Sequence, residues 1–224
     1  MNVIKPSFEI LTPIDPVSIC KQIERVTRTC YKSEDKITEK SAPKMVKALI
    51  KSQHMAMLEH AHITVKFICD RGVSHEIVRH RMASYAQEST RYCNYSSGKH
   101  GNEITVIEPF FFKEGTSEYY TWYGSCLRSE EAYNYLINQG CSPEQARSVL
   151  PNSLKTEIVV TMNLREWMHF FNLRVLGTTG APHPQIKESA LPVLKAFAEA
   201  LPEVFEAQYK QYVFNDSLRK PKED

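Results

Sequence analysis

An alternating stretch near residue 63 constrains the fold of this chain most strongly. Ile63, Val65 and Phe67 are apolar, whereas Thr64 and Lys66 lie between them and are polar. A period of two is typical of a strand that buries one face. The chain must therefore build a sheet, and its helical periodicities elsewhere predict an α+β fold with a small, largely antiparallel sheet surrounded by helices.

A helix is predicted directly after this strand. Asp70 has the chemistry of an N-cap residue, so the helix is expected to begin near Arg71. The apolar positions that follow have helical spacing, at Val73, Ile77, Val78 and Met82. The pattern predicts a helix that continues into the triplet Arg79-His80-Arg81.

The triplet opens a segment rich in arginine and hydroxyl groups, residues 79–92. Successive helical residues are about 100° apart, so a helical triplet would direct Arg79 and Arg81 to roughly opposite sides. They would then contact two ligands, or one of them would face a neighbouring subunit. Arginine forks suit phosphates and pyrimidine carbonyls, which indicates an anion site and allows a nucleotide. A solvated basic helix end is the alternative.

Length, charge and cysteine content set the class of protein. With 224 residues we expect a single domain over 1–224, and a formal charge of +2 without a basic tail argues against a general nucleic-acid binder. Six cysteines without a C-x-x-C pair are typical of reduced thiols in a cytoplasmic protein. The N-terminal residues have no signal-peptide pattern, and no apolar run is long enough for a membrane span.

The rest of the chain has ordinary helix and strand signals. Asp15-Pro16 is a helix start, and Ser142-Pro143 begins a capping box that Gln145 completes. We expect further strands over 3–11, 103–108 and 157–163, and helices over 41–52, 117–139, 164–176 and 186–201. On the helix over 164–176, spacing places Arg165, His169 and Asn172 on one face, and Arg174 on the opposite side from Arg165.

Four motifs, in order, resemble one family. Arg79-His80-Arg81 followed by seven residues and Ser89, then Ser89-x-Arg91-Tyr92, resembles the signature of the flavin-dependent thymidylate synthases, the ThyX family. The segments 145–151, 163–165 and 171–174 are similar to three further motifs of that family. The resemblance extends from about His54 to Gln185.

The resemblance implies an enzyme that methylates dUMP reductively to dTMP. The carbon would come from 5,10-methylenetetrahydrofolate, and NADPH would reduce a bound FAD. It also implies a homotetramer whose active sites are shared between subunits. In this family the reduced flavin activates the uracil ring, which agrees with the lack of a recognisable nucleophile context at any cysteine.

The same resemblance assigns the site residues. Arg91 and Arg147 would hold the nucleotide anion with Ser89 and loop amides, and Arg174 would be catalytic by stabilising negative charge on the ring. Ser89 has no base assigned to it, so we interpret it as a ligand and not a nucleophile. The full set expected to bind substrate is Glu76, Arg79, Gln87, Glu88, Ser89, Thr90, Arg91, Arg147 and Arg174.

A second set is expected to hold FAD: His54, Ala56, Arg79, His80, Arg81, Gln87, Asn163, Arg165 and His169. Some of these depart from the family pattern. Ala56 replaces a Ser or Thr, Ala86 replaces a frequent Asn, Gln87 replaces a commonly acidic residue, and His169 replaces an Asn. The departures at Ala86 and Gln87 predict a different flavin orientation near that loop, and Ala56 removes an expected side-chain contact. The segment 177–182 is longer than the family pattern.

Three other classes of function remain open. A nucleotide-binding regulatory module would bind the nucleotide without a flavin. A metal-dependent hydrolase would use His54, Glu59, His60 and His62, although no H-E-x-x-H motif places them in one geometry and we expect no metal site. A single-strand nucleic-acid binder would use the aromatic residues and arginines. The near-neutral charge of the chain argues against this class.

Overall fold

The computed structural model describes residues 1–91, 95 and 103–219, so the turn expected over 98–102 lies outside the described residues. The chain divides into two compact units. Unit 1 comprises Met1–Phe8, Lys66–Arg79 and Tyr85–Val159, and unit 2 comprises Glu9–Val65, His80–Ser84 and Val160–Asp224. We expected a single domain over the whole chain, and whether the two units fold as one stays a prediction.

Strands form a four-stranded and a two-stranded sheet. The four-stranded sheet has the order β2 (Ser7–Ile10), β3 (His62–Asp70), β6 (Lys155–Asn163), β4 (Ala83–Gln87). β1 (Asn2–Ile4) pairs in parallel with β5 (Thr105–Ile107). The single strand expected over 3–11 is therefore wrong: the chain forms β1 and β2, and Pro6, which has no amide donor, lies between them.

The predicted alternation in β3 is confirmed, and its neighbour β6 runs antiparallel to it. The Leu164 amide, just after β6, donates to the Ala61 carbonyl just before β3. At the other ends, the Arg71 amide donates to the Leu154 carbonyl. Side chains alternate strictly between buried and half-buried along β6, so both central strands direct one face into the core.

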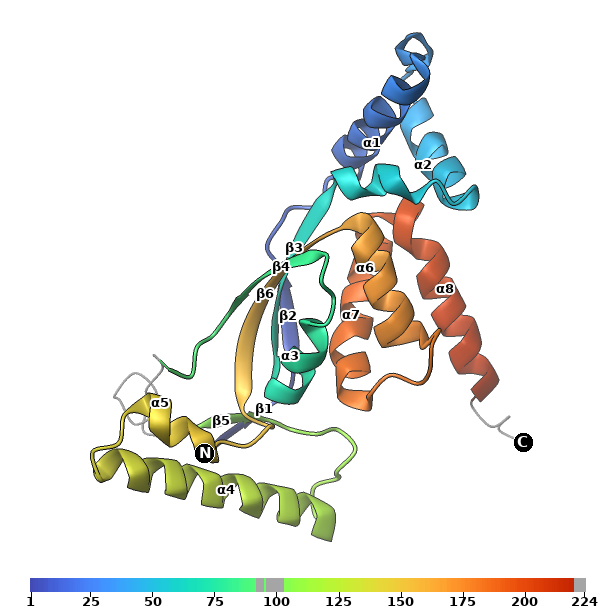
Figure 1. Cartoon of the computed structure of the whole chain (residues 1–224). Coiled ribbons are helices and arrows are strands. Elements are labelled where there is room, and N and C mark those ends of the chain that lie inside the picture. Colours follow the sequence, from blue (N-terminus) through green and yellow to red (C-terminus); the bar gives the residue numbers. More distant parts are fainter. Residues whose placement is uncertain (92–94, 96–102, 220–224) are drawn as a thin grey trace. The chain divides into compact units, whose positions relative to one another are not determined.

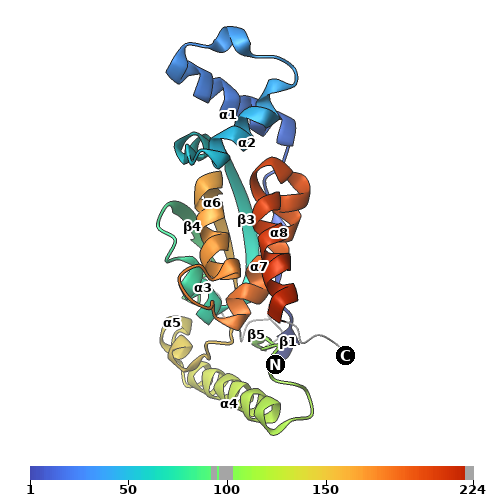
Figure 2. The ribbon, with the colours of Figure 1, turned by 90° about the vertical axis from the view of Figure 1, so that its right-hand side faces the viewer.

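Unit 2 contains α1 (Pro16–Tyr31), α2 (Ser41–Lys51), α6 (Leu164–Phe171), α7 (Pro184–Ala200) and α8 (Pro202–Arg219). Asp15 caps α1 as expected, accepting from the Val17 and Ser18 amides. Figures 1 and 2 both show α7 and α8 side by side, next to α6.

An aromatic core holds α6, α7 and α8 together. Trp167 and Phe171 on α6 are fully buried and contact Phe197 on α7, which in turn contacts Phe205 on α8. The Trp167 indole also donates to the Ile63 carbonyl at 3.0 Å. This core fixes α6, the helix that carries the candidate cofactor residues Arg165 and His169.

Unit 1 contains α3 (Arg71–Ile77), α4 (Ser117–Asn138) and α5 (Pro143–Ala146). The expected capping box at Ser142 and Gln145 is confirmed. Tyr133 of α4 is fully buried in a cluster with Val106 of β5, whereas Tyr120 and Tyr135 of α4 are exposed. Across the described helices, none has the length and apolar character needed to cross a membrane.

Candidate active site

The Arg79-His80-Arg81 triplet is not helical, which corrects the sequence prediction. α3 ends at Ile77, and Figure 1 shows the chain turning into β4 soon afterwards. The Tyr85 hydroxyl, on β4, donates to the Ile77 carbonyl at 3.0 Å and so satisfies one of the last carbonyls of the helix. The argument for opposed arginines therefore loses its basis. Arg79 and Arg81 are both exposed and belong to different units.

In unit 1, the segment after β4 meets the end of α5. Arg147 donates from Nη1 to the hydroxyl of the buried Thr90 at 3.3 Å, and the Ser89 hydroxyl accepts from the Arg91 amide at 3.3 Å. Four of the residues expected to hold the nucleotide, from two distant parts of the sequence, thus lie on one surface. This surface presents two guanidinium groups and two hydroxyls, the donors that a phosphate requires.

Arg91 already has an anionic neighbour on that surface. Its Nε lies 3.4 Å from Oε2 of Glu144, and both side chains are about half exposed, at 51% and 56%. An ion pair of this kind contributes little, on the order of 0–1 kcal/mol, because water screens both charges. A dianionic phosphate can therefore displace Glu144 from Arg91.

Gln87 and Glu88 are held by bonds within unit 1. The Gln87 amide nitrogen donates to the hydroxyls of Ser74 at 2.9 Å and Thr156 at 3.2 Å. The Glu88 carboxylate accepts from Lys155 Nζ at 3.1 Å and from the Glu157 amide at 3.2 Å. These bonds give both residues a role in fixing β4 beside β6.

Lys155 stays charged in this arrangement. Burial works against the ammonium form, but bonds to Glu157 and the charge of Glu88 outweigh it and raise the pKa of Lys155 above its ordinary value. Glu76, the remaining candidate of unit 1 besides Arg79, is half-buried on α3.

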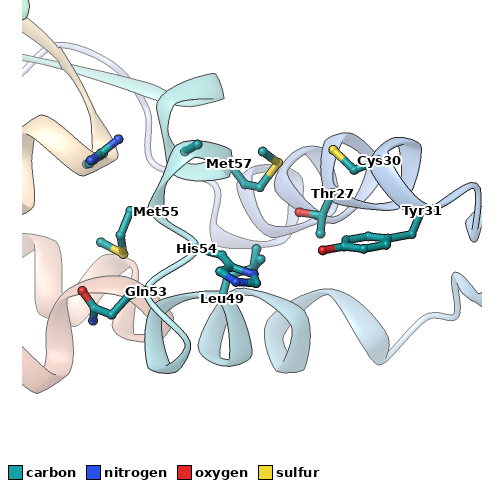
Figure 3. Close-up of a pocket in the computed structure, with 10 residues that line it drawn as sticks. Thr27, Cys30, Tyr31, Leu49, Gln53, His54, Met55 and Met57 are labelled. Carbon is teal, nitrogen blue, oxygen red and sulfur yellow. The ribbon is translucent and has the colours of Figure 1, made fainter.

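Unit 2 contains a cavity of about 420 Å³ between α1, α2 and the 3₁₀ segment Met55–His60. Two expected flavin ligands, His54 and Ala56, line it together with Arg165. Figure 3 shows the rings of His54 and Tyr31 in the space between the two helices, with Met57 beside them. Flat rings and thioethers on the wall suit a planar aromatic ligand.

A second cavity, of about 340 Å³, shares Arg165 with the first. Asn163, Glu166 and His169 of the β6–α6 junction line it with Met82. Arg165 also forms an ion pair with Glu59 at 2.5 Å, and both side chains are partly exposed. Asn163 accepts from the Glu166 amide at 2.8 Å, so it also acts as the N-cap of α6.

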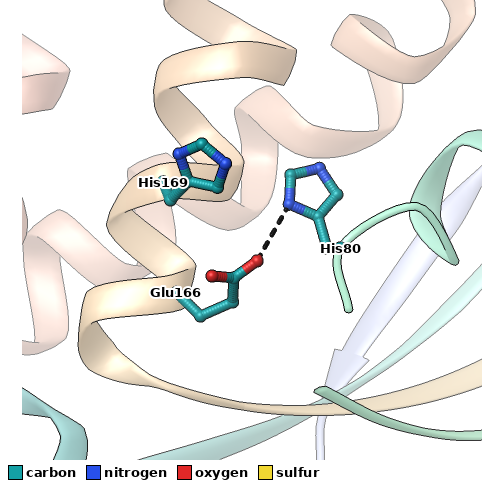
Figure 4. A group of neighbouring side chains, drawn as sticks. All are labelled: His80, Glu166 and His169. Atoms are coloured by element: carbon teal, nitrogen blue, oxygen red, sulfur yellow. Dashed lines mark hydrogen bonds and ion pairs between the residues drawn. The ribbon is translucent and has the colours of Figure 1, made fainter. Parts of the chain in front are cut away.

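His80 lies at the centre of a polar chain in unit 2. Its Nδ1 is 3.2 Å from Oε1 of Glu166, as drawn in Figure 4, and its Nε2 accepts from Arg174 Nε at 3.1 Å. Burial, then the charges of Arg174 and His169, lower the pKa of His80 to about 4. His80 is therefore neutral at pH 7, and its contact with Glu166 is a hydrogen bond and not an ion pair.

Arg174 lies in a segment where the helix changes its winding. We expected one helix over 164–176, but α6 ends at Phe171 and a π-helical turn spans Asn172–Leu176. The 100° step used to place Arg174 opposite Arg165 does not apply in a π turn. The Asn172 side chain accepts from Gln208 on α8 at 2.7 Å.

Two rival sites can be compared with these contacts. Within the described residues, His80, Glu166 and His169 have ligand atoms within 4.8 Å of one another, as a metal ion would require. This group contains none of the histidines considered for a hydrolase.

The cysteines of the described part are free thiols. Burial raises the pKa of Cys20 to about 11 and also raises that of Cys126, which makes them poor nucleophiles.

Sequence reasoning did not single out Glu166 or Tyr31. Glu166 lies three positions before His169, so helical spacing alone would have placed both on one face. Tyr31 is the last residue of α1 and is 72% exposed, which in a sequence looks like an ordinary surface position. Tyr31 lines the same cavity as His54 because α1 packs against α2.

Comparisons with known proteins agree with the motifs. The model of the family described as thymidylate synthase complementing protein matches residues 18–203. The flavin-dependent thymidylate synthase of Pyrococcus furiosus is 37% identical over 188 residues, covering 84% of this chain and 75% of that protein. The enzyme of that name from Geobacter sulfurreducens is 32% identical over 185 residues, covering 80% and 77%.

A solved structure with the same fold is the UMP/dUMP methylase PolB from Streptomyces cacaoi, bound with 5-Br dUMP. Its TM-score is 0.75 at 22% identity, and the match covers 92% of this chain and 96% of that one. These matches define a mixed helix and sheet protein with the ThyX-like fold. The chain belongs to the family of flavin-dependent thymidylate synthases.

Proposed function

We propose that this protein is an enzyme that converts dUMP to dTMP by reductive methylation, using FAD, NADPH and 5,10-methylenetetrahydrofolate. The observation that carries the proposal is the pair of cavities that meet at Arg165. Five of the residues expected to bind the flavin line them: His54, Ala56, Asn163, Arg165 and His169. They come from two segments about one hundred residues apart in the sequence, and the fold of unit 2 brings them together.

The walls of these cavities fit a flavin. The first cavity offers ring and thioether surface at Tyr31, His54 and Met57, and the second offers hydrogen-bonding groups at Asn163 and His169. Arg165 supplies positive charge where the cavities meet. When bound, FAD would carry reducing equivalents from NADPH to the substrate.

The nucleotide is proposed to use the surface of unit 1. Arg91 and Arg147 would bind its phosphate, with the hydroxyls of Ser89 and Thr90 completing the set of donors. Gln87 and Glu88 form bonds within the protein that shape β4, and both keep their proposed place in the substrate site. Glu76 and Arg79 keep their proposed place near the substrate.

Arg174 is proposed as the catalytic residue. A fixed guanidinium stabilises negative charge that develops on the pyrimidine ring during methyl transfer, and a preoriented charge acts without reorganisation. The bond from Arg174 Nε to His80 provides such an orientation. No cysteine thiol is needed in this scheme, in keeping with the raised pKa values of Cys20 and Cys126.

A visible absorption spectrum tests the flavin part of the proposal. The purified protein is mixed with FAD, desalted and then treated with NADPH under anaerobic conditions, with and without dUMP. A retained flavin band that NADPH bleaches at a rate sensitive to dUMP supports the proposal. A protein that binds dUMP but retains no flavin would instead be a nucleotide-binding regulatory module.

A further inference from the structure

We infer that Glu166 is a positioning residue, which fixes the ring tautomer of His80 and through it the direction of the Arg174 guanidinium. The inference rests on the proposed function in so far as Arg174 acts on the substrate. Its structural part, the order Glu166, His80, Arg174, is independent of that function. All three residues lie in unit 2.

The bond to Arg174 determines which nitrogen of His80 carries the proton. A guanidinium can only donate, so the His80 Nε2 atom, 3.1 Å from Arg174 Nε, must present its lone pair. A neutral imidazole carries one proton, which must then be on Nδ1. His80 is neutral at pH 7 because burial and the nearby charges lower its pKa to about 4.

The bond to Glu166 selects the same tautomer independently. Oε1 of Glu166 lies 3.2 Å from His80 Nδ1, and an ionised carboxylate can only accept. Two partners on opposite sides of the ring thus require the same proton position. The common tautomer in solution does not decide the outcome here, because the carboxylate on Nδ1 and the cation on Nε2 both favour the Nδ1–H form.

Glu166 is itself held in place by the start of α6. Its amide donates to the Asn163 cap at 2.8 Å, and its side chain is only 13% exposed. The groups facing His80 are Glu166, His169 and Phe170 from α6 and Arg174 from the π turn. Glu166 is a carboxylate bonded at Nδ1, so it can hold a proton on that nitrogen.

The tautomer of His80 determines the direction of the Arg174 guanidinium. A bond at Nε fixes the plane of the guanidinium, whose two terminal amino groups carry its remaining donors. In the opposite tautomer the Nε2–H of His80 would oppose the Nε–H of Arg174, and the guanidinium would have to turn away. Glu166 thus acts on the substrate through two other side chains and need not contact it.

A divalent metal ion on His80, Glu166 and His169 is the competing interpretation of the same cluster. The Arg174 cation, bonded directly to His80, disfavours an ion there. Metal analysis of the purified protein decides between them. A stoichiometric metal that chelator removes, with loss of Arg174-dependent activity, would overturn the inference.

The main experiment compares Glu166→Leu with Glu166→Gln, because a glutamine oxygen can still accept from Nδ1–H and a leucine cannot. Glu206, a half-buried carboxylate of unit 2 that pairs with Lys210 on α8, is the matched control, with the same two substitutions. The readouts are the ¹⁵N NMR shifts of the His80 ring, which distinguish the protonated from the unprotonated nitrogen, and kcat and KM for dUMP.

We expect Nδ1–H in the unmodified protein and loss of that signature in Glu166→Leu. That variant should also lose about 10- to 100-fold in kcat with a smaller change in KM, the usual size of effect for a residue that orients a ligand-contacting group. Glu166→Gln should recover most of that loss, and both Glu206 variants should be unchanged.

The outcomes separate the inference from the proposed function. If the unmodified protein makes no dTMP but shows Nδ1–H that depends on Glu166, the proposed function is wrong and the structural part of the inference stands. An Nε2–H tautomer, or equal kcat in Glu166→Leu and the unmodified enzyme, overturns the inference while leaving the proposed function intact.

Discussion

Arg147, at the end of α5, donates a hydrogen bond from Nη1 to the hydroxyl of the buried Thr90 over 3.3 Å. The bond fixes one cation beside the Ser89–Arg91 segment. Arg91, the second cation, lies on the same surface and is paired with the exposed Glu144. Arg91 and Arg147 give positive charge to the surface of unit 1 that is proposed to bind the nucleotide.

Arg147→Ala should weaken dUMP binding and leave FAD retention unchanged. Loss of one hydrogen bond to a charged group costs roughly 1.5–3 kcal/mol, or about 10- to 100-fold in affinity. Isothermal titration with dUMP measures the change. Arg128→Ala, at an exposed position of α4, is the control that should bind normally. Unchanged affinity in Arg147→Ala would remove Arg147 from the nucleotide surface.

Arg174→Ala should abolish dTMP formation while most of the FAD remains bound, because Arg174 is proposed to act on the ring and the cavities around Arg165 are left intact. Arg174→Lys keeps the charge but cannot donate from Nε to His80 in the same plane, so it should also fall far below the unmodified rate. Single-turnover assays measure both variants. Unmodified turnover in Arg174→Ala would exclude the catalytic role.

Sharing of active sites between subunits can be tested by mixing Arg147→Ala with Arg174→Ala subunits at a dUMP concentration too low for Arg147→Ala alone to turn over. If one site takes Arg147 from one subunit and Arg174 from another, then exchange of Arg147→Ala with Arg174→Ala subunits should restore part of the activity. Native mass spectrometry of the mixture proves the exchange and gives the number of subunits. Proven mixed assemblies without activity would place both arginines of each site on a single subunit.

The lowered pKa of His80 predicts a pH dependence of stability. Between pH 6.5, the ordinary His value, and about 4, the unfolded chain binds a proton at His80 that the folded protein does not bind. The free energy of unfolding should therefore fall as pH falls through this range, by at most about 3 kcal/mol from this residue.

Urea unfolding between pH 6.5 and 5 measures this dependence. His80→Asn should flatten the pH profile, whereas His62→Asn, at an exposed position of β3, should leave its slope unchanged. The range stops at pH 5 because burial raises the pKa of Glu166. Proton uptake by folded Glu166 at lower pH would raise the free energy of unfolding and so oppose the effect of His80. Equal slopes in all three proteins would show that His80 titrates normally.

Local sequence signals were sufficient to predict those structural features that depend only on residues close together in the chain. The alternation of β3, the Asp15 and Asp70 caps and the capping box at Ser142 were all predicted and are present. Each requires only residues within one or two turns of each other.

Features that depend on tertiary contacts were missed. α3 ends at Ile77, whose carbonyl accepts from the Tyr85 hydroxyl, whereas the spacing of the apolar residues favoured continuing the helix. The role of Glu166 arises from His80, 86 positions away in the sequence. The division of the candidate residues between two units likewise follows from chain packing and has no local signal.

The most direct test of the central claim is product formation from dUMP. The purified protein is incubated with FAD, NADPH, 5,10-methylenetetrahydrofolate and dUMP, with each component omitted in turn and with UMP as an alternative substrate, and the nucleotides are separated by chromatography. The account predicts dTMP that requires every component and is absent with Arg174→Ala. Full flavin reduction and dUMP binding without any dTMP would contradict it.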